Sequence, residues 1–223
     1  MSFLGIICGL KLEADCLKGY RFNDNMRIAI SGARPDQAER EARRLCEDGA
    51  KGLLSFGLCG GLDPDLQPGS LVVPSELEHD TQIWGISPFV VSRKVIRTPL
   101  GLGRDTVIAD PEEKARLYEE TGATIVDMES HRIAKVCQER TIPFYVLRAV
   151  CDPARQALPE SAADAVDAAG RARPLRVLRG LINHPGDIVD LIRLKRQTDA
   201  AKAALKRAAR TEVPNILRSV QLV

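Results

Sequence analysis

Hydrophobic residues along this chain gather in short continuous runs, and longer amphipathic stretches separate these runs. Runs of this length that are rich in Ile, Leu and Val predict strands buried on both faces of a sheet. Such strands are expected at residues 3–8, 27–30, 52–56, 70–74, 123–127 and 143–151.

Helix start and stop signals mark several of the stretches between the runs. Pro35 opens one predicted helix and Gly49 ends it. Asp110 caps a second helix, which stops at Gly122, and a third covers residues 129–140. Strands that alternate with helices predict an α/β fold, with a largely parallel sheet that carries helices on both faces.

Two regions depart from this alternation. Residues 75–109 have a weak pattern around the single tryptophan, Trp84, and are expected to form a hairpin or excursion. Asp152 with Pro153 is expected to cap a helix. After residue 162 the pattern is helical, with helices predicted at 174–182, 187–196 and 198–210 and a break at 184–186.

The composition is that of a globular protein, and a length of 223 residues needs only one domain, 1–223. Residues 171–210 carry a local charge of +8, which leaves −6 for the rest because the whole chain has +2. Residues 171–223 are therefore expected to form a basic helical C-terminal extension.

The six cysteines form no C-x-x-C pair, which favours a reducing compartment, and the apolar N-terminus reads as a strand without signal-peptide features. No apolar run is long enough for a membrane span. These features predict a cytoplasmic protein.

Acidic residues and glycines follow several of the predicted strands. Glu13 comes after the first strand, Gly57 and Gly60 after the third, Glu129 after the fifth and Asp152 after the sixth. Ligands of open α/β sheets bind at the carboxyl ends of the strands. We therefore expect these residues to form one site, although each carboxylate alone could simply cap a helix.

Carboxyl groups suit the cleavage of a glycosidic carbon–nitrogen bond. A carboxylic acid can protonate a ring nitrogen of the departing base, and a second carboxylate can hold the sugar hydroxyls and stabilise its positive charge. His79, His131 and His184 share no metal-ligand spacing, so no metal site is predicted. Arg34, at a helix N-terminus, could hold an anion or be an ordinary surface arginine.

These segments together resemble the superfamily of purine nucleoside phosphorylases and methylthioadenosine/S-adenosylhomocysteine nucleosidases. The resemblance lies in residues 5–13, 55–62, 68–73, 126–130 and 148–152. It implies a three-layer α/β/α sandwich with a central mixed sheet, a homo-oligomer, and no cofactor beyond phosphate as a co-substrate.

The resemblance also implies roles for individual residues. Glu129 would bind the ribose hydroxyls, Met128 would pack on the sugar, Asp152 would act on purine N7, and Glu13 would position water. Asp127 is expected to be structural. The substrate contacts predicted besides Met128 are Gly57, Gly60, Phe56 and Arg34.

The glycine segment departs from the family pattern. Ser55 and Leu58 stand where hexameric phosphorylases have the arginine and serine that bind phosphate. Phosphate would then depend on Arg34 or on backbone amides, and the choice between phosphorolysis and hydrolysis stays open.

The C-terminal part resembles the hopanoid-associated phosphorylase branch, which implies phosphorolysis of an adenosylhopane with release of adenine. Its basic helices could then contact the inner face of a membrane, or could equally be solvated or form a subunit contact. The alternatives are a hydrolytic nucleosidase and a non-catalytic nucleoside-binding protein. A nucleic-acid partner is not expected, because the basic stretch lacks interleaved aromatic residues.

Overall fold

The computed structural model describes residues 2–19, 25–157 and 188–222. Its centre is an eight-stranded mixed sheet with the order β2-β1-β3-β7-β6-β4-β5, in which β8 also pairs with β3 and β4. The strands are β1 (Phe3–Cys8), β2 (Met26–Ile30), β3 (Ala50–Gly61), β4 (Leu71–His79), β5 (Gln82–Gly85), β6 (Val95–Gly103), β7 (Ile125–Asp127) and β8 (Phe144–Asp152).

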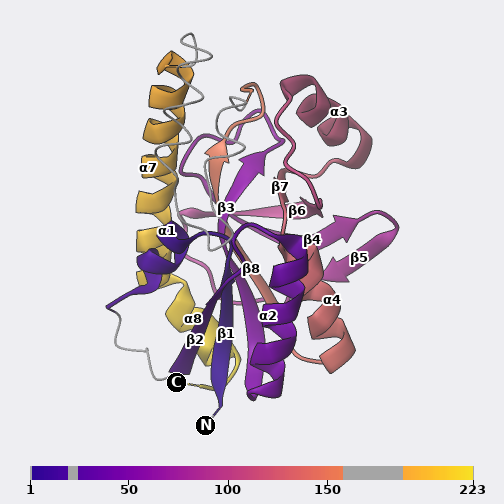
Figure 1. Cartoon of the computed structure of the whole chain (residues 1–223), viewed down its shortest axis with the longest axis vertical. Coiled ribbons are helices and arrows are strands. Elements are labelled where there is room, and N and C mark those ends of the chain that lie inside the picture. Colours follow the sequence, from indigo (N-terminus) through magenta and orange to yellow (C-terminus); the bar gives the residue numbers. More distant parts are fainter. Residues whose placement is uncertain (1, 20–24, 158–187, 223) are drawn as a thin grey trace.

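Helices cover both faces of this sheet, which confirms the predicted three-layer α/β/α fold (Figure 1). The helices α7 and α8 lie on one side of it, and α2 and α4 lie on the other. The helical elements are α1 (Lys11–Ala14), the 3-10 turn η1 (Asp15–Leu17), α2 (Pro35–Glu47), α3 (Pro111–Thr121), α4 (Ser130–Arg140), α7 (Ile188–Thr211) and α8 (Val213–Ser219). None of the described helices combines the length and apolar character needed to cross a membrane.

Strand β8 shows why the apolar runs become central strands. All of its residues are buried, and successive side chains point to opposite faces. Tyr145 and Leu147 join the core beneath α7 and α8, whereas Phe144 and Val146 join the core beneath α2 and α4. A strand with helices on both sides must be apolar at every position, with few exceptions.

The described C-terminal helices pack into the sandwich. Ala204, Leu205 and Ala208 of α7 and Ile216 of α8 are fully buried in the core on that face of the sheet. The two helices predicted at 187–196 and 198–210 form the single helix α7, in which Thr198 Oγ1 donates to Leu194 O at 2.8 Å. The predicted helix at 174–182 and the break at 184–186 lie outside the described residues.

Residues 75–109 add two strands to the sheet. The predicted hairpin is present as β4 and β5, but the nine-residue β6 was not predicted. Its sequence mixes Arg97, Thr98 and Pro99 with apolar residues, so it lacks a continuous apolar run. Its place is set by parallel pairing with β4 on one side and β7 on the other.

Two local predictions were wrong. The expected glycine loop is the continuation of β3 to Gly61, because Gly57 and Leu58 still pair with Arg148 and Ala149 of β8. No helix begins at Pro153: within the described residues the chain leaves β8 in a turn.

Candidate active site

A cavity of about 200 Å³ opens where β1, β3, β7 and β8 end. Its lining joins acidic residues with small and apolar ones. The lining residues are Gly9, Leu10, Glu13, Ala33, Leu58, Cys59, Gly60, Thr106, Val107, Ile108, Val126, Asp127, Met128, Glu129, Cys151 and Asp152.

Glu13 enters the cavity from α1 and is held by backbone on both sides. Its Oε2 accepts a hydrogen bond from Leu10 N at 2.8 Å, and its Oε1 accepts one from Leu58 N at 2.8 Å. Burial raises the pKa of the Glu13 carboxyl, while nearby Arg148 and these amides oppose the rise. Glu13 is therefore a fixed carboxyl group whose protonation can change closer to neutral pH.

Asp127 builds the turn that presents Glu129. Its Oδ1 accepts hydrogen bonds from the backbone amides of Glu129 (2.9 Å) and Ser130 (2.7 Å), and its Oδ2 accepts one from Ser130 Oγ at 2.6 Å. These contacts satisfy donors at the start of α4. Asp127 therefore has the structural position that was expected of it.

Glu129 is buried and lies against Arg148, whose Nη2 donates to Glu129 Oε2 at 3.3 Å. Burial raises the pKa of Glu129 to about 7, and the negative charges of Asp127 and Glu13 add to the rise while Arg148 opposes it. The carboxyl group needs the space that Gly9 leaves: a Cβ on Gly9 would lie 2.7 Å from Glu129 Oε1.

Arg148 is a central residue of the site that the sequence analysis did not assign. It is 1% exposed, and its Nη2 lies 3.1 Å from Asp127 Oδ1 and 2.6 Å from Ser55 Oγ. Its Nη1 donates to Leu58 O at 3.1 Å. A lone arginine inside the apolar run of β8 was the available signal, because a buried charge must be paired.

Asp152 has an ionic partner that was also missed. Lys114 of α3 is 0% exposed, and its Nζ lies 2.7 Å from Asp152 Oδ2. Burial raises the pKa of the Asp152 carboxyl, and the charge of Lys114 opposes that rise. The signal was a lysine on the buried stripe of a helix, three residues before the buried Leu117.

The other predicted contacts divide into two groups. Met128 and Gly60 line the cavity, and Gly57 leaves room for Glu13, since a Cβ there would lie 2.7 Å from the Glu13 carboxylate oxygens. Among the described residues, the lining includes neither Phe56, which is fully buried in the core, nor Arg34, which pairs with Asp36 at the surface.

The residues that line the cavity do not favour the binding of phosphate there. Four carboxyl groups line the cavity, and among the described lining residues none is Lys or Arg. The buried cations Arg148 and Lys114 are already paired with Glu129 and Asp152. A phosphate dianion would therefore meet like charges and no unpaired cation there.

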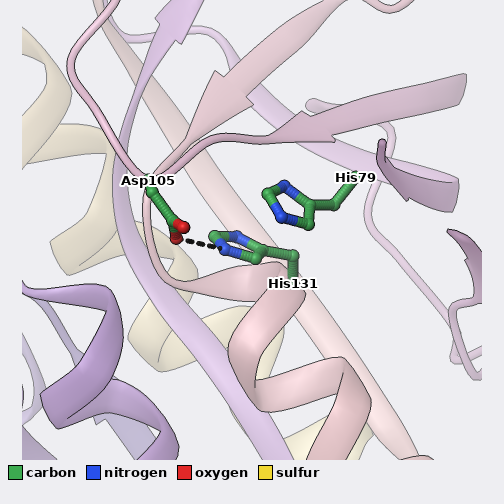
Figure 2. A group of neighbouring side chains, drawn as sticks. All are labelled: His79, Asp105 and His131. Atoms are coloured by element: carbon green, nitrogen blue, oxygen red, sulfur yellow. Dashed lines mark hydrogen bonds and ion pairs between the residues drawn. The ribbon is translucent and has the colours of Figure 1, made fainter. Parts of the chain in front are cut away.

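A loop from β6 to α3 forms one wall of the cavity and is tethered through Asp105. His131 Nε2 lies 2.9 Å from Asp105 Oδ1, and His131 stacks on His79 with ring centroids 4.1 Å apart (Figure 2). His79 and His131 are far apart in the sequence, so no spacing motif predicted that they would lie together.

The geometry of these three residues suits a tether better than a metal site. Their potential ligand atoms lie within 4.8 Å of one another. However, the two rings are stacked with planes only 22° apart, and ring nitrogens bind a metal in the ring plane at about 2.0–2.1 Å. Asp105 is in addition paired with Arg132.

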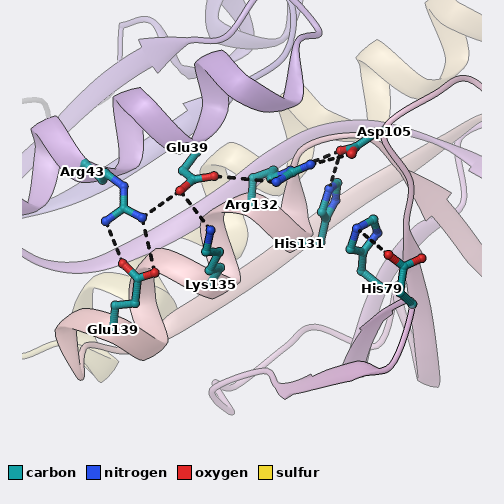
Figure 3. A network of polar contacts seen from close by, with 9 residues as sticks. Glu39, Arg43, His79, Asp105, His131, Arg132, Lys135 and Glu139 are labelled. Atoms are coloured by element: carbon teal, nitrogen blue, oxygen red, sulfur yellow. Dashed lines mark hydrogen bonds and ion pairs between the residues drawn. The ribbon is translucent and has the colours of Figure 1, made fainter.

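The tether continues into an ion-pair network between α2 and α4 (Figure 3). Arg132 joins Asp105 to Glu39, at 3.8 Å from Glu39 Oε2, and Arg43 joins Glu39 to Glu139, at 2.7 Å from each. The cavity wall is thus connected to the helical layer on the α2 and α4 face.

The acidic residues meet for a reason other than the one predicted. The alternation of strands and helices predicted a largely parallel sheet, but β7 runs antiparallel to β3, with Gly60 opposite Val126. Because β3 is twelve residues long and extends past the end of β1, β7 can pair with its last residues and bring Glu129 back toward Gly57. Glu13, Asp127, Glu129 and Asp152 therefore line one cavity.

Solved structures of similar fold extend over the whole chain. A putative 5′-methylthioadenosine/S-adenosylhomocysteine nucleosidase from Francisella philomiragia matches with a TM-score of 0.65 at 18% identity, covering 98% of this chain and 100% of that one. The nucleosidase from Neisseria meningitidis in complex with methylthio-immucillin-A matches with a TM-score of 0.61 at 20% identity, covering 94% and 98%. Futalosine hydrolase of Helicobacter pylori matches with a TM-score of 0.60 at 18% identity, covering 82% and 97%.

At these identities the solved structures establish the shared fold. The family assignment comes from the sequence, which matches the phosphorylase superfamily over residues 17–99 and 100–183. These two segments span most of the chain and confirm the enzyme class predicted from the resemblance in residues 5–13, 55–62, 68–73, 126–130 and 148–152. The chain therefore belongs to the phosphorylase superfamily.

Proposed function

We propose that this protein cleaves the N-glycosidic bond of a purine nucleoside and releases adenine. The observation that carries the proposal is the convergence of Glu13, Glu129 and Asp152 on one cavity. The fold neighbours that are named as nucleosidases and as a futalosine hydrolase support it.

The three carboxyl groups divide the reaction between them. Asp152 protonates N7 of the purine while the C1′–N9 bond breaks and its electron pair goes to the base. Glu129 accepts hydrogen bonds from the ribose hydroxyls and stabilises the positive charge that develops on the sugar. Met128 packs on the sugar beside it.

We propose water as the attacking group, with Glu13 as its base. Glu13 removes a proton from water as the oxygen bonds to C1′, which yields the free sugar and adenine. The raised pKa of Glu13, caused by its burial, suits a base that works near neutral pH. The absence of an unpaired Lys or Arg from the described lining favours this choice over the predicted phosphorolysis.

An apolar 5′ substituent is the substrate feature that the cavity favours. Leu10, Leu58, Ile108 and Val107 line it, and Val107 is 51% exposed. Such a wall accommodates a methylthio group or a longer hydrocarbon. The adenosylhopane-type substrate, its place in hopanoid biosynthesis, the homo-oligomer and the membrane contact stay predictions.

Incubation with adenosine, methylthioadenosine and an adenosylated lipid, each with and without phosphate, tests the proposal. Adenine should be released at a rate that does not depend on phosphate, and Asp152→Asn should reduce that rate by about 10²- to 10⁴-fold. A phosphate-dependent rate with a ribose-1-phosphate product would establish phosphorolysis. Nucleoside binding without any adenine release would make the chain a non-catalytic binding protein.

A further inference from the structure

Lys114 occupies an unusual position for a lysine. Its side chain is fully buried on α3, although a buried ammonium group is costly unless it is paired and hydrogen-bonded. The Nζ donates to Asp152 Oδ2 at 2.7 Å, to Gln156 O at 3.3 Å and to Pro153 O at 3.4 Å. An ammonium group has three N–H donors, so these acceptors use all of them.

This arrangement tells us what Lys114 can do in the reaction. Its three protons point to Asp152 and to the two carbonyls, and Lys114 does not line the cavity whereas Asp152 does. Lys114 therefore acts through Asp152 and not on the substrate. It holds one carboxylate oxygen of Asp152 and leaves the other oxygen available to the purine.

We propose that Lys114 is a positioning residue that sets the protonation and orientation of Asp152. Burial alone favours the neutral acid, and the ammonium group 2.7 Å away favours the carboxylate. The pair places the acid between these limits, so that Asp152 can gain a proton from solvent and donate it to N7 within the working pH range. The catalytic part of this inference rests on the proposed function.

Gly60 leaves room for this arrangement on the β3 side. A Cβ at Gly60 would lie 3.2 Å from Asp152 Oδ2, the same oxygen that Lys114 holds. A larger residue at this position would therefore press on the carboxylate that Lys114 orients.

The direct test is a carbon-13 NMR titration of the Asp152 carboxyl group, assigned with Asp152→Asn. Lys114→Met, which keeps the length of the side chain and removes its charge, should raise the midpoint of that titration by about 1 to 3 pH units. Lys114→Gln should raise it too, whereas Lys114→Arg should keep it near the wild-type value. An unchanged midpoint in folded Lys114→Met overturns the proposal.

The titration is independent of turnover, so it separates this inference from the proposed function. If wild-type protein releases no adenine, the proposed function fails while the titration still tests Lys114. With active protein, the alkaline limb of the kcat/KM profile, along which Asp152 loses its proton, should move to higher pH in Lys114→Met but not in Lys114→Arg. A merely structural lysine would lower activity without moving that limb.

Should neither neutral variant fold, the wild-type protein alone provides the test. The carbon-13 resonance of Lys114 Cε should shift with the same midpoint as the Asp152 carboxyl group, because the two charges lie side by side. A Lys114 resonance that does not respond to the titration of Asp152 would overturn the proposal.

Discussion

The site contains more buried carboxyl groups than buried cations. Glu13, Asp127 and Glu129 lie around the single guanidinium group of Arg148. Burial raises the pKa values of Glu13 and Glu129, and the single guanidinium group opposes the rise only in part. For Glu129 the negative charges of Asp127 and Glu13 add to the rise. Both carboxyl groups therefore lose their protons at a higher pH than an exposed glutamate does.

Glu129→Gln tests this balance through pH. The pKa of Glu129 is raised to about 7, mainly by burial, and sugar hydroxyls need the carboxylate form as an acceptor. The kcat/KM of the wild type should therefore rise with pH along a limb near pH 7. In Glu129→Gln that limb should be absent, and kcat/KM at pH 8 should fall by about 10- to 100-fold.

The same raised pKa predicts an effect on stability. The unfolded Glu129 carboxyl loses its proton near its ordinary pKa of 4.5 and the folded one near 7, so stability is lost as pH rises between these values. The melting temperature of Glu129→Gln, measured relative to that of the wild type, should thus be higher at pH 8 than at pH 5. A constant difference across this range would contradict the pKa assignment.

Gly57→Ala tests the fit between β3 and Glu13. The new Cβ would lie 2.7 Å from the Glu13 carboxylate oxygens, so Glu13 must move. A displacement of this kind at a reacting group should lower kcat by about 100-fold. Gly85→Ala on β5 is the matched control, because a Cβ there meets nothing within 4 Å. Equal activity of both variants would show that Glu13 is not needed where it stands.

At the scale of elements, the site is completed by the loop between β6 and α3. Thr106, Val107 and Ile108 of this loop line the cavity, and Asp105 fastens it to His131 and Arg132 of α4. The loop lines the cavity but carries none of the three carboxyl groups to which we assign the proposed reaction. Holding this loop in place should therefore affect substrate binding more than the rate of the chemical step.

Asp105→Ala should release this loop. Ordering it would then be part of the cost of binding, so KM should rise roughly threefold to tenfold with kcat nearly unchanged. Asp199→Ala on α7, which removes the exposed pair with Lys195, serves as the control and should leave KM as it is. A fall in kcat with unchanged KM in Asp105→Ala would place the loop in the chemistry instead.

At the scale of the whole molecule, the C-terminal helices are a full layer of the sandwich. The buried face of α7 packs against β8 and β4, and α8 packs against α7 and shares the same core. Most of the basic residues of α7 lie on its outer face. The part of the predicted basic charge that lies on α7 is therefore on the outer side of a helix whose other side is in the core.

Leu205→Ala should show this in unfolding experiments. Leu205 is 0% exposed, so its truncation should lower the free energy of unfolding by about 2–5 kcal/mol. Ile192→Ala on the same helix is the control, because Ile192 is 50% exposed and should change stability by less than about 0.5 kcal/mol. Denaturant titration measures both, and equal small effects would mean that α7 is not part of the core.

The sequence by itself determined the elements whose signals are local. Apolar runs placed β1, β3 and β8. Prolines, a cap and glycines placed α2 and α3, and an amphipathic pattern placed α4, because strand burial and helix ends depend on nearby residues. Only the tertiary structure decided what depends on pairing across the chain. It placed β6 in the sheet without an apolar run, reversed β7 against β3, and brought Arg148 and Lys114 to carboxylates that are distant in sequence. A charged residue in an apolar run indicates that a buried partner is needed, but only the tertiary structure determines which residue that partner is.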